Sequence, residues 1–136
     1  MQKYIIILLI LILYLTVTYF ACDFTDDKLK IINTSDEKIG ILLNIHYPDT
    51  SLVGADEPKW TWPNPTPINP NDTTNYRLLN RRWKYIFRDT EKVTFIFIDW
   101  DIIDEFGYDI NRYEVLSRKI LSETQLDSLN WVLIYP

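Results

Sequence analysis

The stretch KVTFIFID, residues 92–99, decides the fold of this chain. Successive side chains of an extended strand point to opposite faces. The apolar residues of this stretch then divide into two sets, Val93, Phe95 and Phe97 on one face and Ile96 and Ile98 on the other. A strand that is apolar on both faces is covered on both faces. We therefore expect residues 92–99 to form a central strand.

Alternating apolar and polar residues predict further strands around this one. We expect them over residues 28–33, 38–46, 76–79, 114–121 and 131–135. Residues 33–37 have the composition of a turn, so the first two strands should form a β-hairpin whose second strand is half-buried. The last strand is apolar on both faces, which suggests that it inserts into the sheet.

Three segments carry helix signals. Residues 81–88 place apolar side chains at helical spacing, Asp99 or Asp101 can cap a helix that ends at Gly107, and a capping box begins at Ser122. The expected buried residues of these helices are Trp83, Ile86 and Phe87, then Ile102, Ile103 and Phe106, then Leu126 and Leu129. The sequence thus predicts a β-rich α+β fold, with a mostly antiparallel sheet of about six strands and two or three short helices. A β-sandwich is the alternative.

An apolar segment precedes this domain. Residues 4–20 would span about 25 Å as a helix, a length between that of a secretory signal and that of a membrane-spanning helix. Cys22 is the single cysteine of the chain, and a lone cysteine in an exported protein needs an explanation. The sequence Tyr19-Phe20-Ala21-Cys22 resembles a bacterial lipobox, in which the signal is cut before the cysteine and the thiol is acylated. Ala21 and Cys22 match that pattern, whereas Tyr19 and Phe20 stand where it prefers Leu and a small residue.

This resemblance implies a signal peptide over residues 1–21 and a palmitate-type lipid on Cys22. An uncleaved single-span anchor and an ordinary signal peptide with an incidental cysteine are the alternatives. Residues 22–27 form an acidic linker that contains Asp23, Asp26 and Asp27. The linker is similar to the export tract of surface lipoproteins in Bacteroidota, which implies the outer membrane or cell surface rather than the inner membrane. One globular domain, residues 28–136, would follow, with a proline-rich loop over residues 48–75.

The net charge of the chain restricts the classes of partner that it can bind. After removal of residues 1–21, the chain holds 13 basic and 19 acidic side chains, a net charge of −6. An acidic chain is a poor nucleic-acid binder, because phosphate contacts need clustered Lys and Arg. The basic residues within 81–88 are interpreted as a solvated helix face, which leaves the acyl chain on Cys22 as the membrane contact. We find no cofactor motif.

Four features were weighed as sites. Trp60 and Trp62 face the same side of an extended chain and could stack on a sugar ring or pack the loop onto the domain. His46 is the single histidine and is assigned a structural or surface role. Thr73, in Asp72-Thr73-Thr74, resembles a glycan acceptor of Bacteroidota.

The fourth feature is an acidic cluster made of Asp99, Asp101, Asp104, Glu105 and Asp109. Its spacing does not match an EF-hand loop, and acidic residues at a helix N-terminus already compensate the helix dipole. Metal binding and a glycosidase-like carboxylate pair are therefore the weaker hypotheses, and no metal site is predicted.

Several segments together resemble a family of small Bacteroidota lipoproteins that has no assigned activity: FIFID (residues 95–99), SETQLDSLNW (122–131), the terminal Tyr135-Pro136 and the segment 47–52. The resemblance implies a location at the cell envelope and does not imply a reaction. The leading hypothesis is a non-catalytic module at the cell envelope that binds a glycan, a peptide or an envelope protein. A small carboxylate-dependent hydrolase is the rival.

Overall fold

The computed structural model describes residues 25–50, 52, 65–79 and 82–136. The elements in this part of the chain, in order, are β1 (Thr25–Asn33), β2 (Ile39–Asn44), β3 (Thr66–Ile68), β4 (Thr73–Leu79), α2 (Trp83–Asp89), β5 (Val93–Asp99), α3 (Trp100–Phe106), the 3-10 helix η2 (Ile110–Arg112), β6 (Val115–Leu121), α4 (Glu123–Ser128) and β7 (Val132–Tyr135).

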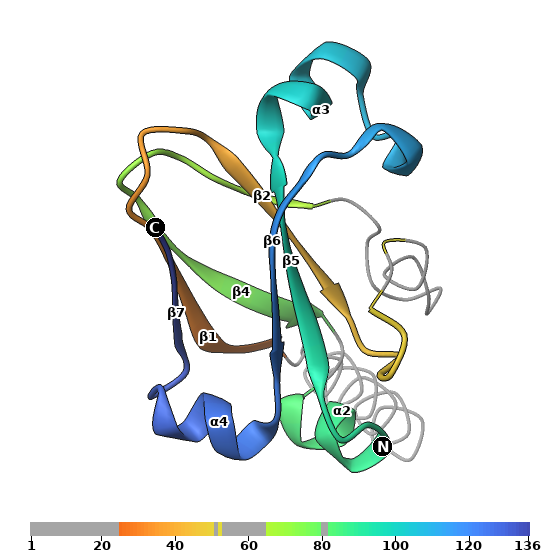
Figure 1. Cartoon of the computed structure of the whole chain (residues 1–136). Coiled ribbons are helices and arrows are strands. Elements are labelled where there is room, and N and C mark those ends of the chain that lie inside the picture. The colour runs from red at the N-terminus through yellow and green to blue at the C-terminus, as the bar shows by residue number, and fades with distance from the viewer. Residues whose placement is uncertain (1–24, 51, 53–64, 80–81) are drawn as a thin grey trace, which may run out of the picture.

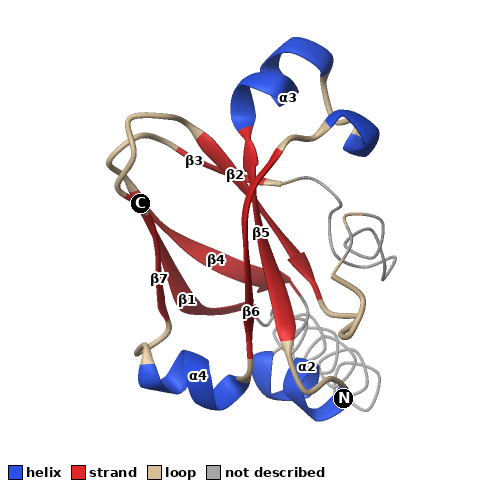
Figure 2. Ribbon diagram, viewed as in Figure 1, coloured by secondary structure: helices blue, strands red, loops and turns tan. Residues whose placement is uncertain are grey.

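The seven strands form two sheets (Figures 1 and 2). The smaller sheet has the order β4-β1-β7 and is mixed, because β1 runs antiparallel to β4 and parallel to β7. The larger sheet has the order β3-β2-β5-β6 and is antiparallel. The predicted β-rich α+β class is confirmed. The strands are divided between two sheets, as the sandwich alternative anticipated.

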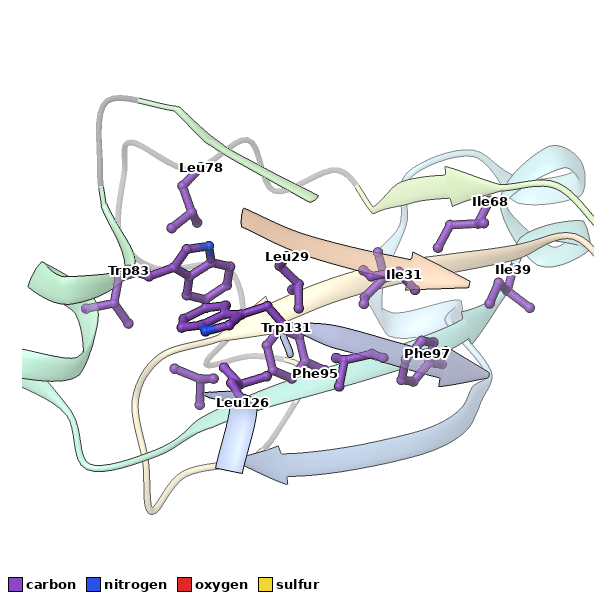
Figure 3. Packing of buried hydrophobic residues seen from close by; sticks show 14 residues of the cluster. Leu29, Ile31, Ile39, Ile68, Leu78, Trp83, Phe95, Phe97, Leu126 and Trp131 are labelled. Carbon is purple, nitrogen blue, oxygen red and sulfur yellow. The ribbon is translucent and has the colours of Figure 1, made fainter. Parts of the chain in front are cut away.

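The main core lies between the two sheets (Figure 3). Leu29 and Ile31 of β1 meet Phe95 and Phe97 of β5 there. At one end Trp83, from α2, packs at a tilt against Trp131, which lies between α4 and β7, with ring centroids 5.4 Å apart. Apolar burial of this kind is the main favourable term in folding, so this core joins the sheets and two helices into one unit.

A second cluster covers the other face of the larger sheet. Ile96 and Ile98 of β5 pack there against Trp100 and Ile103 of α3 and against Tyr113. Both faces of β5 are therefore buried, and β5 lies between β2 and β6. The prediction of a central strand covered on both sides is confirmed.

The helices lie at the two ends of the molecule. α2 and α4 are at one end, and α3 is at the opposite end (Figure 1). The predicted caps are confirmed: Asp99 caps α3, Gly107 follows it with a φ of 73°, and Ser122 and Gln125 form the capping box of α4. Four expected buried residues are not fully buried: Phe106 and Leu129 are each 44% exposed, and Phe87 and Ile102 are half-buried.

The predicted β-hairpin is wrong, because β1 and β2 belong to different sheets. The side chain of Asn33, fully buried, holds the corner between them. Its amide donates to the carbonyls of Glu37 (2.7 Å) and Asn69 (3.1 Å), and its oxygen accepts from the Ser35 amide (3.0 Å). These bonds direct the chain from one sheet to the other instead of turning it back. β2 is also buried on both faces along most of its length, not half-buried.

Two further expectations need correction. β7 is the edge strand of the smaller sheet and is not inserted into it, and its Ile134 is 51% exposed. The proline-rich segment 48–75 is not a continuous loop, because it contains β3 and the start of β4. Pro67 lies in β3 at the sheet edge, where its missing N–H costs no ladder bond.

Candidate functional site

The acidic cluster lies on α3 and at the N-terminal caps of α3 and η2. Asp99 accepts from the Asp101 amide (2.9 Å), and Asp109 caps η2 by accepting from the Asn111 amide (3.1 Å). Asp104 accepts from the indole N–H of Trp100 (2.8 Å). Three of the five carboxylates of the cluster therefore have roles in the local structure.

The acidic cluster lies within the described part of the chain. No group of three or more acidic, histidine or cysteine side chains there is placed to hold an ion. Asp101, Asp104 and Glu105 are exposed to solvent. Beside them lie exposed aromatic residues: Phe106, with the Arg112 guanidinium 4.6 Å from its ring centroid, and Tyr108, which packs edge-on against Trp100.

The other candidate residues are scattered. Cys22, Trp60 and Trp62 lie outside the described residues. His46 is exposed, and its backbone amide donates to the Asn44 side chain (2.7 Å). Thr73 is exposed at the first position of β4, where its amide donates to Asp72 (2.7 Å). His46 follows β2 at the end away from Asp99, because Ile39 pairs with Asp99 and Asn44 with Thr94, and Thr73 belongs to the smaller sheet.

The predicted acidic linker contains a structural residue. Thr25 already pairs with Leu79 in the smaller sheet, so the first strand begins before the expected boundary at residue 28. The Asp26 carboxylate accepts a hydrogen bond from the Trp83 amide (3.0 Å) at the start of α2. A carboxylate at this position satisfies one of the free N–H groups of the helix. The chain therefore attaches α2 directly to the beginning of β1.

The structure also contains an apolar hollow that the sequence did not indicate. It has a volume of about 380 Å³ and lies between the edge strands β6 and β7, near the end of α4. Its lining residues are Lys119, Ile120, Leu121, Leu129, Val132, Leu133 and Ile134. Lys119 crosses it and donates from Nζ to the backbone carbonyl of Ile134. A lysine at a strand edge discourages pairing with another strand. The lining residues come from three different predicted elements, so only the packing of these elements in the folded domain creates the hollow.

A charged cluster joins β1 to α4. The Lys28 ammonium lies 3.8 Å from the ring centroid of Trp131, and the Trp131 indole donates to Asp127 (2.7 Å). This hydrogen bond lowers the pKa of the Asp127 carboxyl, burial opposes the shift, and the charge of Lys28 adds to it. Hydrogen bonds to the charged form favour that form.

Burial affects two tyrosines and two polar groups of the domain. Burial raises the pKa of Tyr76 well above its usual range. Burial also raises the pKa of Tyr135, and the nearby charges of Glu37 and Asp99 add to this shift. The indole N–H of Trp83 and the hydroxyl of Thr94 are buried without a hydrogen-bond partner among the described residues. Because the Trp83 indole lies inside the main core, we assign it to packing.

Comparison with known proteins does not assign the chain to a family. No protein-family model, no curated protein and no solved structure matches the chain. In the described residues, no helix is both long and apolar enough to cross a bilayer. The apolar segment 4–20 lies outside those residues.

Proposed function

We propose that the chain is an exported lipoprotein of the Bacteroidota type that it resembles, held at the cell envelope by acyl chains on Cys22. Its domain acts as a non-catalytic binding or structural module. The outer membrane or the cell surface is the proposed location, and a glycan, a peptide or an envelope protein is the proposed partner class.

The observation that carries this proposal is the position of Cys22. It directly follows the apolar segment 4–20 and Ala21, and only two residues separate it from Thr25, where β1 begins. A folded domain that begins so soon after the cysteine would be tethered closely to the membrane. The local roles of the carboxylates on α3 and η2 support a binding or structural module over the hydrolase alternative.

The deciding experiment compares the wild type with Cys22→Ala in cells fed labelled palmitate. We expect the wild-type chain to take up label and to lose residues 1–21 by mass, and the variant to do neither. If both proteins keep residues 1–21 and take no label, the segment is a transmembrane anchor. If both lose the segment without label, it is an ordinary signal peptide.

The hydrolase alternative needs its own test. A carboxylate enzyme needs a pair of acids flanking the scissile bond, and here Asp104→Asn and Glu105→Gln would each remove one of the three exposed candidates. We expect the full-length protein to turn over no glycoside substrate. Turnover that either substitution abolishes, with the fold intact by circular dichroism, would establish the hydrolase instead.

A further inference from the structure

We infer that the exposed face of α2, formed by Lys84, Tyr85 and Arg88, lies against the phospholipid headgroups of the membrane that anchors Cys22. This inference rests on the proposed acylation of Cys22. It adds an orientation to the proposed function: the α2 end of the domain faces the lipid and the α3 end points away.

The first argument is the length of the tether. Four residue steps separate Cys22 from Asp26, and an extended chain covers at most about 14 Å over that distance. The Asp26 carboxylate is bonded to the Trp83 amide, at the first residue of α2, over 3.0 Å. The start of α2 is therefore held close to the acylated residue, whatever the orientation of the rest of the domain relative to the membrane.

The second argument is the chemistry of the α2 face. Tyr85 is 45% exposed, with the Lys84 ammonium 4.8 Å and the Arg88 guanidinium 5.5 Å from its ring centroid. Arg88 also pairs with Asp89 over 3.0 Å. Tyrosine is enriched where an apolar region meets water, and Lys and Arg extend long apolar stems toward polar surroundings. Lipid phosphates offer acceptors to this set of groups.

The third argument is the difference in charge between the two ends of the molecule. Residues 82–92 carry four basic and two acidic side chains. The start of β1 and α4, at the same end, add Lys28 and four acidic side chains, so this end carries five basic and six acidic side chains in all. Residues 99–112, at the opposite end, carry five acidic side chains and one basic side chain. Anionic lipid attracts basic groups near its surface. The field would therefore turn α2 toward the membrane and α3 away from it (Figure 1).

The test uses the full-length acylated protein in vesicles of phosphatidylethanolamine and phosphatidylglycerol. Tyr85→Cys and the matched control Tyr108→Cys each receive a fluorescent label. Tyr108 is also exposed, at 58%, and lies just after α3 at the far end. A nitroxide quencher is carried on the lipid headgroups. We expect headgroup quenching at position 85 to be at least threefold stronger than at position 108.

A second variant tests the role of charge. Lys84→Glu combined with Arg88→Glu, in the Tyr85→Cys background, should reduce quenching at position 85 toward that at position 108. Mass spectrometry of each preparation separates the two proposals. An acylated chain with equal quenching at both positions overturns the orientation and leaves the lipoprotein proposal standing. A chain without acylation on Cys22 overturns both.

Discussion

The indoles of Trp83 and Trp131 pack against each other with centroids 5.4 Å apart, yet only one of their N–H groups has an acceptor among the described residues. Trp131 donates to Asp127, whereas the N–H of Trp83 is buried without a described partner. An unsatisfied buried donor costs about 1–3 kcal/mol. We therefore expect Trp131→Phe to lower the free energy of unfolding by about 1 kcal/mol more than Trp83→Phe.

Urea unfolding of both variants and the wild type, followed by circular dichroism, measures this difference. Both substitutions remove the same atoms from one aromatic cluster, so each is the size control for the other. Equal destabilisation would show that the Trp131–Asp127 hydrogen bond contributes nothing net.

Asp127 makes stability depend on pH. Its pKa is lowered in the folded protein, first by the hydrogen bond from Trp131. A group with a lowered folded pKa contributes stability that is complete above the unfolded value of about 3.9 and is lost as the pH falls through the folded value. Asp127→Asn should therefore be less stable than the wild type at pH 7, and the gap should narrow below about pH 4. Urea unfolding at pH 7 and pH 3 checks this, and a constant gap would contradict it.

The buried hydroxyl of Thr94 lowers the stability of the folded protein. The residue is fully buried in β5, and its Oγ1 has no hydrogen-bond partner among the described residues. Thr94→Val keeps the β-branched shape and removes the unsatisfied group. We expect it to raise the free energy of unfolding by about 1 kcal/mol. The exposed Thr73 offers a control, because Thr73→Val should change stability by less than about 0.5 kcal/mol. Destabilisation by Thr94→Val would mean that the hydroxyl is satisfied.

Asn33 fixes the crossing between the sheets. Asn33 is fully buried, and Asn33→Ala removes its side-chain donors and acceptor. The carbonyls of Glu37 and Asn69 and the amide of Ser35 then lose their hydrogen-bond partner. We expect the free energy of unfolding to fall by about 2–3 kcal/mol, at the upper end of the cost of a lost buried partner. The exposed Asn75 of β4 is the matched control, since Asn75→Ala should have little effect. Equal unfolding midpoints for the two variants would contradict this role of Asn33.

The local features of the fold were readable from the sequence. The caps at Asp99 and Ser122 depend on residues within three positions of each other, and the two apolar faces of β5 follow from strand geometry. Helix α2 was predicted from the spacing of Trp83, Ile86 and Phe87. The roles of the candidate site residues were harder to predict from the sequence. Of the acidic cluster, only the capping role could be anticipated, and the hollow between β6 and β7 had no sequence signal.

By itself, the sequence determined six of the seven strands and the three short helices, where α3 and α4 begin, and that β5 must be covered on both faces. These depend on contacts and hydrogen bonds between neighbours in the chain. Only the tertiary structure decided that β1 and β2 separate into different sheets, that β7 pairs in parallel at an edge, and that Phe106 and Leu129 stay exposed. Those outcomes depend on partners distant in sequence, such as Asn33 with Asn69 and β1 with β7, and a local pattern carries no information about which distant segment it will meet.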